Sequence, residues 1–464
     1  MPIRLYDSTT QEPVDFTPLV AGHVSMYVCG PTVQSEPHIG HLRSALVYDL
    51  WTRWFSYRGY QVTMIRNVTD IDDKILEKAT DEPWWALASR VERLFHDATR
   101  ALRIHPPALE PRATGDIPAM IALISRLIER GHAYVADDGS GDVYFDVASW
   151  PEYGALTRQS PDDMESLGEG SAAKRSAHDF ALWKGHKESE PETAQWPAPW
   201  GAGRPGWHLE CSAMSARYLG PEFDIHGGGL DLRFPHHENE LAQSRAAGDP
   251  FARCWVHSGL VKVGGQKMSK SLGNSILTSD WLDRAPAVVV RYALSTAHYR
   301  SDIDLHDGVL DEAASAFERI TGFMDRAGSA GESSSVPDAF AESMDDDLSI
   351  PQALAVLHDT VRQGNQALDS GDSDAARTAA AQVRGMLECL GLNPESDEWT
   401  DTGAGPGVEA ETMDRLVTGL ITARDRAREA KDFAVADALR DVADQAGIEL
   451  TDTAQGTGWK TRGR

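Results

Sequence analysis

The sequence predicts an α/β protein built on a parallel, doubly wound sheet. Two short β-rich runs, Val24–Val28 and Gln61–Val68, are separated by a helical pattern from Leu42 to Tyr57. That order forms a βαβ unit, which implies parallel strands joined by a helical crossover. Strand character returns much later, at Phe223–His226 and Cys254–Val263.

Other segments differ in pattern from this core. Helical patterns dominate from Asp72 to about His132. The region from Tyr134 to Gly206 is rich in Gly, Pro, Ser and acids, with short strands such as Asp142–Asp146, and we interpret it as an insertion into the sheet fold. The pair Gly264-Gly265 suits a type I′ hairpin turn, because both central positions of that turn need φ > 0.

From Pro286 onward the pattern is helical and is interrupted by two linkers. Ala327–Val336 is a small-residue, serine-rich break, and a helical bundle is expected from Pro337 to about Leu392. Asn393–Gly407 is a second linker, rich in Pro, Gly and acids. The residues after it are expected to form one long amphipathic helix with a basic tip.

Composition limits the functional class. The formal net charge of −27 argues against a general polyanion binder, although a local basic face can still bind RNA. The four cysteines are too few and too scattered for a disulfide framework, so a reducing compartment fits best. Neither a signal peptide nor a run of 18 apolar residues is evident, and we therefore expect a cytoplasmic protein without a membrane span.

The stretch from Met26 to His41 is the most informative part of the chain. It reads as a buried strand, a turn that begins at Cys29, and then a helix that opens on His38 and His41. Helix N-termini attract anions through free backbone N–H groups and the helix dipole. One βα connection therefore holds a thiol, as a possible metal ligand, and a phosphate-binding site.

A second motif, the lysine loop Gly264–Asn274, contains Lys267-Met-Ser-Lys-Ser271 and follows a short strand. The chain has no G-x-x-x-x-G-K-[ST] motif, which excludes a P-loop, and no G-x-G-x-x-G after a strand. Either motif alone would be a weak signal. Together, in this order, they resemble the two ATP-binding signatures of class I aminoacyl-tRNA synthetases, and their residues are most similar to those of cysteinyl-tRNA synthetases.

This resemblance implies a Rossmann-like class I synthetase catalytic domain and a definite reaction. The carboxylate of L-cysteine would attack the α-phosphorus of ATP and expel pyrophosphate, and cysteine would then pass to tRNA(Cys). His38 and His41 would bind the phosphates, while Lys267 and Lys270 would close over the leaving pyrophosphate. Catalysis of such a step is mostly positioning and charge stabilisation, and Mg²⁺ would accompany ATP without a dedicated protein cage.

Four residues from three distant segments form a possible metal site. Cys29 and Cys211 would supply thiolates, and His236 and Glu240 lie at positions i and i+4, on one face of a helix. This is a plausible zinc set. The residues alone also allow interpretations without a metal. A lone cysteine is more often a small buried hydrophobic residue, and the His/Glu run also fits a solvated helix face. The resemblance implies one zinc per chain at these four positions.

The same resemblance implies how cysteine is selected. Serine differs from cysteine by one atom, so a pocket built only on shape would separate them poorly. A zinc ion that accepts the substrate sulfur prefers a soft thiolate to a hydroxyl and lowers the thiol pKa. The candidate residues around the amino acid are Thr69, Trp207, His226 and Asp231. Thr69 lies at the carboxyl edge of the sheet, in a segment that also reads as a helix N-cap followed by acids.

The resemblance covers nearly the whole chain and suggests five regions. These are the first half of the catalytic domain (1–133), the insertion (134–206), the second half with the zinc site and the lysine loop (207–290), a stem-contact region with a helical bundle (291–400), and a small anticodon-binding domain (401–464). The family tends toward monomers, so we expect a monomer.

The last region carries basic and aromatic residues. Ala427–Ala443 is helical in pattern and holds Arg428, Lys431 and Arg440, and Trp459 lies near the terminus with further basic residues. An aromatic among cations can stack on an unpaired base while its neighbours pair with phosphates. Taken alone, the segment also fits an ordinary solvated helix with a frayed end. The resemblance favours contact with the anticodon end of the tRNA.

Two alternatives remain open. A sister enzyme, which joins cysteine to a glucosaminyl-inositol in mycothiol synthesis, shares the zinc site and both ATP signatures, but it usually reads Gly-Ile-Thr where this chain has Gly30-Pro-Thr32 and lacks the long tail. The other alternative is a non-catalytic, zinc-dependent RNA-binding or regulatory paralogue. The intact histidines and lysines of the two signatures argue against it. One departure from the family, Gln34-Ser35 in place of Tyr-Asp, receives no role.

Overall fold

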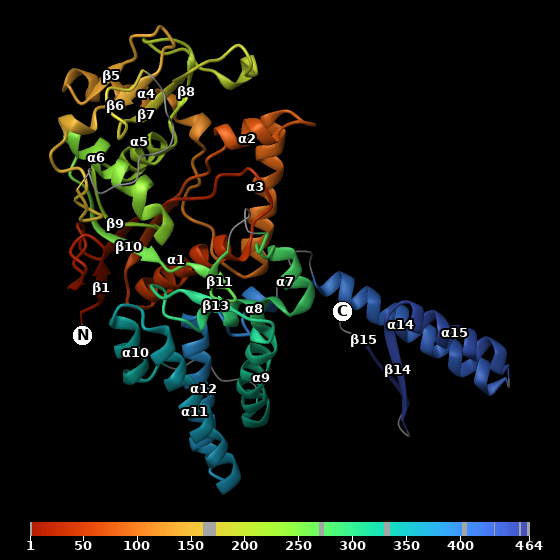
Figure 1. Cartoon of the computed structure of the whole chain (residues 1–464). Coiled ribbons are helices and arrows are strands. Elements are labelled where there is room, and N and C mark those ends of the chain that lie inside the picture. Colours follow the sequence, from red (N-terminus) through yellow and green to blue (C-terminus); the bar gives the residue numbers. More distant parts are fainter. Residues whose placement is uncertain are drawn as a thin grey trace. The chain divides into compact units, whose positions relative to one another are not determined.

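The computed structural model describes residues 2–160, 173–268, 273–328, 335–400, 406–430, 432–453 and 456–461. The chain divides into two compact units, Met1–Leu392 and Asn393–Arg464 (Figure 1). The second unit therefore begins at the start of the segment that we predicted as a linker. In the described ranges no helix has the length and apolar character needed to span a membrane.

A four-stranded parallel sheet in the order β10-β9-β3-β4 organises the first unit. Its strands are β3 (His23–Val28), β4 (Gln61–Arg66), β9 (Glu222–Gly229) and β10 (Phe251–Ser258). The predicted βαβ unit is confirmed, because α1 (Ile39–Tyr57) crosses between β3 and its parallel neighbour β4. The predicted α/β class with a parallel sheet is confirmed with it.

Both faces of this sheet are buried, as the alternation of its side chains shows. In β3, Met26 and Val28 belong to one hydrophobic cluster and Tyr27 to the other, and Val256 and Trp255 of β10 divide in the same way. The first cluster includes the inner side of α1, and the second includes α5 (Trp207–Leu219) and α6 (Glu238–Ala246). A parallel sheet covered on both faces leaves its strand ends for a ligand.

The insertion forms a second sheet, which is antiparallel and has the order β5-β6-β7-β8. Its strands are β5 (Ala133–Val135), β6 (Val143–Phe145), β7 (Phe180–Gly185) and β8 (Gly203–Pro205). Three helices precede it: α2 (Asp73–Lys78), α3 (Trp84–Ala101) and α4 (Ile117–Glu129). Phe145 and Leu182 of the insertion lie in the same hydrophobic cluster as Tyr27 and α5, and in Figure 1 α5 and α6 lie between the insertion and the parallel sheet.

The run Cys254–Val263 belongs to two different sheets. β10 ends at Ser258, and β11 (Val261–Val263) enters a separate sheet with β12 (Gln266–Lys267) and β13 (Ile303–Leu305). The division falls at Gly259, where a Cβ atom would lie 2.3 Å from the carbonyl oxygen of Ser301. The predicted hairpin turn is confirmed, because Gly264 and Gly265 have φ of 59° and 79° between the paired strands β11 and β12.

Helices complete the first unit, as predicted from Pro286 onward, except that the strand β13 interrupts them between α8 and α9. They are α7 (Thr278–Arg284), α8 (Ala287–Ser295), α9 (Val309–Ala327), α10 (Asp338–Asp345), α11 (Ile350–Ser370) and α12 (Ser373–Cys389). An N-terminal hairpin of β1 (Arg4–Asp7) and β2 (Glu12–Asp15) lies beside β10, where the Trp255 N–H donates to Asp7 Oδ1 at 2.9 Å. Most of the predicted linker Ala327–Val336, at 329–334, lies outside the described residues.

The second unit differs from the single long helix that we predicted. It contains α13 (Asp397–Thr400), α14 (Pro406–Glu429), α15 (Phe433–Gln445) and an antiparallel hairpin of β14 (Ile448–Thr453) and β15 (Gly456–Thr461). The segment Ala427–Ala443 is broken because Asp432 caps a new helix, accepting a hydrogen bond from Val435 N at 3.2 Å. Helix α14 also begins at Pro406, within the predicted linker.

Candidate active site

The site begins at a tight turn after β3. A Cβ atom on Gly30 would lie 1.6 Å from the carbonyl oxygen of Asn67, so only glycine fits where the chain after β3 passes the chain after β4. The Gly30 N–H donates to Asn67 Oδ1 at 2.8 Å. The two connections then run side by side, with the Thr69 N–H donating to the carbonyl oxygen of Pro31 at 3.2 Å.

Helix α1 is fixed to the same edge of the sheet. The Tyr48 hydroxyl lies 2.7 Å from the carbonyl oxygen of Gly228 and 2.8 Å from that of Val256, at the carboxyl ends of β9 and β10. At the start of the helix, His38 is the N-cap residue and its backbone N–H donates to His41 Nδ1 at 3.2 Å. The two imidazole rings stack with centroids 3.7 Å apart.

The four predicted metal ligands converge. One ligand atom from each of Cys29, Cys211, His236 and Glu240 lies within 4.8 Å of every other. The two Sγ atoms are 3.5 Å apart, Cys29 Sγ is 3.3 Å from Glu240 Oε1, and His236 Nε2 is 3.0 Å from that same oxygen. Two thiols, an imidazole and a carboxylate around one small volume suit a tetrahedral Zn²⁺ site.

Neighbouring side chains hold these four residues in place. His226 Nε2 contacts Glu240 Oε2 at 2.8 Å, His208 Nδ1 contacts His236 Nδ1 at 3.0 Å, and Cys211 Sγ donates to Asn67 Oδ1 at 3.6 Å. Such partners orient metal ligands and tune their basicity. His226 and His237 also form a second close group with Cys29 and Glu240.

Electrostatics within the cluster favour the anionic form at two of the four positions, Cys211 and Glu240. Burial opposes ionisation of Cys211, but the hydrogen bond from Cys29 and the nearby His236 outweigh it and lower the pKa of Cys211 to about 6. Burial also opposes charge on Glu240, yet His226 and His236 lower the pKa of Glu240 to about 2. Burial and the neighbouring Cys211 raise the pKa of Cys29. A cation would relieve this accumulation of negative charge.

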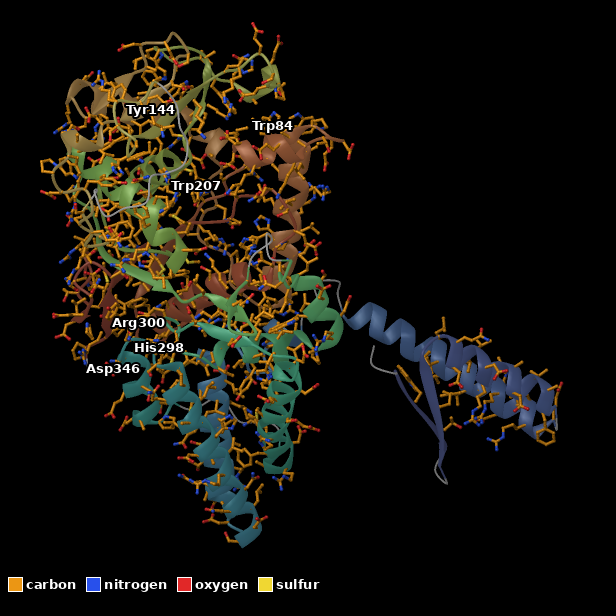
Figure 2. All side chains as sticks on the ribbon, in the orientation of Figure 1. Trp84, Tyr144, Trp207, His298, Arg300 and Asp346 are labelled. Atoms are coloured by element: carbon orange, nitrogen blue, oxygen red, sulfur yellow. The ribbon has the colours of Figure 1, made fainter. Side chains whose placement is uncertain are left out.

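A cavity of about 370 Å³ opens beside the cluster at the carboxyl ends of the strands. Its lining includes the predicted metal ligand Cys29 and five of the residues that the sequence predicted for substrate and phosphate binding: His38, His41, Trp207, Asp231 and Lys267. In the view of Figure 2, Trp207 lies below the insertion sheet, and its side chain is half-buried. Lys267 Nζ lies 3.6 Å from Asp231 Oδ2. Lys270 lies outside the described residues.

Two predicted residues of the cysteine pocket lie behind the cavity wall. Thr69 is buried and donates to Glu210 Oε2 at 2.8 Å. His226 is fully buried, stacked on Trp255 with centroids 4.4 Å apart and bonded to Glu240. Both residues adjoin the metal cluster and are absent from the cavity lining.

Sequence reasoning missed several residues that position this site, namely Asn67, His208, Glu210 and Tyr48. Asn67 has the clearest local signal, since it follows directly on β4 at the edge where ligands bind. His208 and Glu210 lie just before the predicted ligand Cys211 in the sequence, but their partners come from other segments. The expected N-cap after Asn67 is confirmed at Asp72, which accepts from Lys74 N at 2.9 Å.

Comparisons with known proteins agree with this geometry. Residues 15–315 match the family described as the tRNA synthetases class I (C) catalytic domain, and residues 339–393 match the DALR domain. A cysteine–tRNA ligase from Clavibacter sepedonicus is 59% identical over 485 aligned residues, covering 100% of both chains, and one from Leifsonia xyli subsp. xyli is 58% identical over 99% of both. The chain belongs to the cysteinyl-tRNA synthetase family.

Solved structures support the fold at much lower identity. Mycobacterium tuberculosis methionyl-tRNA synthetase in complex with methionyl-adenylate is 14% identical, with a TM-score of 0.56 over 80% of this chain and 90% of its own. The LeuRS of Agrobacterium radiobacter K84, in a ternary complex with tRNA, is 12% identical, with a TM-score of 0.59 over 83% and 86%. The fold of the first unit is thus that of a class I synthetase.

Proposed function

We propose that this protein is a cysteine–tRNA ligase that activates L-cysteine with ATP, releases pyrophosphate and transfers the cysteinyl group to tRNA(Cys). Family membership over the full chain supports the reaction. The observation that carries the proposal is the convergence of two thiols, an imidazole and a carboxylate beside a cavity rimmed by His38, His41 and Lys267. The relatives compared give no support to a glucosaminyl-inositol acceptor.

Zinc is the metal that this donor set favours. Cys29, Cys211, His236 and Glu240 would hold one ion per chain, and the bound ion would bind the substrate sulfur as a thiolate. Cys29 is the one ligand of the four that also lines the cavity, so the substrate sulfur would approach the ion from the side of Cys29. Trp207, whose ring centroid is 4.2 Å from that of His236, would close that approach to water.

The phosphates of ATP would lie at the start of α1. His38 and His41 are held against each other there, and Lys267 reaches the same cavity from β12. Imidazole N–H groups and an ammonium stabilise charge that develops on the leaving pyrophosphate. Lys270 would act with Lys267, and Mg²⁺ would arrive bound to ATP.

The second unit would contact the anticodon end of the tRNA. The structure changes our candidate for the aromatic residue that stacks on a base. Trp459 packs against the hydrophobic core of this unit, formed by Val417, Ala443, Ile448 and Leu450. Phe433, at the start of α15, is 62% exposed and replaces Trp459 as the candidate. An exposed aromatic ring offers a base a stacking surface, and the exposed Arg428 and Arg440 lie in the same unit. We also propose a cytoplasmic monomer.

The test is ATP–pyrophosphate exchange with purified, chelator-washed protein whose zinc content is measured. Exchange should require cysteine, and serine should be a very poor substitute because its hydroxyl is a hard ligand. The second step is tested by offering tRNA and glucosaminyl-inositol as rival acceptors. Full activity in zinc-free protein would overturn the metal assignment, and transfer to the inositol would overturn the acceptor.

A further inference from the structure

Within the part of the chain that the structure describes, the cavity contains one lysine, Lys74, whose ammonium group forms no close ion pair. Lys74 lies on α2, is exposed, and lines the cavity together with Gln34 and Ser35. Its backbone N–H donates to Asp72 Oδ1 at 2.9 Å, and its positive charge acts to lower the pKa of that carboxyl, but no carboxylate among the described residues forms a close ion pair with its ammonium group. In a chain with a net charge of −27, a cavity lysine without a close ion pair is informative.

The other cations of the cavity are compensated. Arg66 donates to Glu110 Oε1 from Nε at 3.0 Å and from Nη2 at 2.7 Å, and its guanidinium lies over the ring of Phe95. Lys267 lies 3.6 Å from Asp231. The charge of Lys74 is therefore available to an anionic ligand that enters the cavity.

Lys74 lies where the insertion meets the parallel sheet. Its neighbour Asp73 accepts from Lys184 Nζ of β7 and from Arg204 Nη2 of β8, each at 2.6 Å. Arg204 is held in turn by Glu190 at 2.7 Å. These contacts fix α2 to the insertion sheet (Figure 1), so Lys74 is presented from a rigid junction.

Lys74 and the proposed ATP-binding groups come from different connections around the cavity. Lys74 follows β4, an edge strand of the parallel sheet, whereas His38 and His41 follow β3 and Lys267 belongs to β12 of a separate sheet. The phosphates of ATP have His38, His41 and Lys267 to bind them, and Lys74 is left for a different anion. In the proposed reaction that anion belongs to the RNA, whose end must reach the activated cysteine.

We propose that Lys74 binds a backbone phosphate in the single-stranded acceptor end of the tRNA and so positions the terminal ribose against the cysteinyl group. The inference rests on the proposed function and assigns this residue a role in the transfer step. Phosphate contacts of this kind fix the register of a nucleic acid without reading its sequence. Lys74 is thus a positioning residue for the acceptor.

The experiment compares Lys74→Ala, Lys74→Arg and the control Lys78→Ala in the full-length protein. Lys78 lies one turn further along α2, and its Nζ donates to Gln34 Oε1 at 2.9 Å without lining the cavity. Each variant is assayed for cysteine-dependent pyrophosphate exchange, for kcat/KM with a tRNA(Cys) transcript at several salt concentrations, and for binding of that transcript and of one lacking its last four nucleotides.

In Lys74→Ala, the loss of charging efficiency should exceed any loss of exchange by about tenfold, and the slope of log kcat/KM against log salt should fall by about 0.7. Lys74→Arg should restore most of both, and Lys78→Ala should resemble the unchanged protein. The variant and the unchanged protein should bind the shortened transcript equally.

Three outcomes would overturn the assignment. A raised KM for ATP in the exchange assay would place Lys74 on the triphosphate, an unchanged salt slope would remove the phosphate contact, and an equal defect on the shortened transcript would place the contact elsewhere on the RNA. Absence of cysteine-dependent exchange in the unchanged protein would instead refute the proposed function, so the two failures are distinguishable.

Discussion

Gly30 shows how one residue determines the geometry of this site. Because its α-carbon passes the carbonyl of Asn67, the turn after β3 can close against the turn after β4, and Cys29 is thereby presented to Cys211 and Glu240. Any side chain here must push the two connections apart. The metal cluster and the packing of the sheet edge therefore depend on the same atom.

We expect Gly30→Ala to destabilise the protein by at least about 1–3 kcal/mol, since overpacking of a fixed backbone contact costs that much or more. It should also lower the zinc content by displacing Cys29. Gly322→Ala is the matched control, because nothing lies within 4 Å of the added Cβ in the middle of α9, and alanine there should stabilise the helix by about 0.5–1 kcal/mol. Urea unfolding and metal analysis measure both. Equal stability of the two variants would contradict the close-approach argument.

Residues in and around the predicted zinc site should also differ in how much they contribute to metal binding. Cys211→Ser should lose zinc on dialysis, because a hydroxyl replaces a thiolate ligand. His208→Ala should retain zinc with an affinity about 10–100-fold lower, because His208 contacts His236 without joining the cluster. Cys254→Ser is the control, since Cys254 is buried in the hydrophobic core away from the ligands. Competition with a chromogenic chelator measures the affinities. Normal zinc binding by Cys211→Ser would refute the ligand set.

At the level of elements, a buried ion pair joins three helices. Asp49 of α1 contacts Arg291 of α8 at 2.5 Å and Arg53 at 2.9 Å, and all three lie within the first unit. Arg291 also donates to the carbonyl oxygen of Leu390, directly after α12. The helix that carries His38 and His41 at its start is therefore fixed near its middle to the helical region.

Asp49→Ala should cost about 3–5 kcal/mol, because it leaves a fully buried arginine without its carboxylate. Asp359→Ala is the control. Its pair with Arg362 has both side chains 63% exposed, so the loss should stay below about 1 kcal/mol. Urea unfolding at neutral pH measures the two free energies. A similar small effect for both variants would show that the buried pair does not hold α1.

The same pair predicts a pH dependence. Burial opposes ionisation of Asp49, but Arg291 and Arg53 outweigh it and hold the pKa of Asp49 well below its ordinary value. A group whose folded-state pKa is depressed stabilises the fold above its unfolded-state pKa, which is about 3.9. That contribution is lost as the pH falls through the folded-state value. The difference in unfolding free energy between the unchanged protein and Asp49→Ala should therefore shrink below about pH 4, as urea titrations can measure. A constant difference down to pH 2 would contradict it.

Elements with strong local signals could be predicted from the sequence, and those set by distant contacts could not. The βαβ unit from His23 to Arg66 follows from short-range periodicity and is confirmed. The split at Gly259 depends on the backbone of Ser301, which lies far along the chain. Likewise, the four metal ligands come from three segments, so resemblance rather than spacing identified them. In the second unit the hairpin was missed, because the apolar alternation after Gly447 is limited to Ile448 and Leu450, too short a run to indicate two strands.

For the whole molecule, the net charge of −27 shapes how RNA can be bound. Bulk attraction is unfavourable, so affinity must come from a few local contacts at each end of the nucleic acid. The first unit contains the cavity and the metal cluster, and the second has its own hydrophobic core around Val417, Ala443 and Ile448. Activation and recognition of the anticodon end are therefore expected to be separable.

A chain ending at Thr400 should keep cysteine-dependent pyrophosphate exchange, because every residue of the cavity and the cluster lies in the first unit. It should charge tRNA poorly at low tRNA concentration, with a raised KM.

Phe433→Ala in the full chain should show part of this defect. Stacking of one base is worth about 1–3 kcal/mol, so binding should weaken by about tenfold or more. Val435→Ala, another exposed apolar residue of α15, is the control for general effects on that helix. Initial charging rates across a range of tRNA concentrations measure all three. If the shortened chain charges tRNA at the full rate when tRNA is scarce, the second unit is not an anticodon module, because a module that supplies binding energy cannot be removed without a cost in KM.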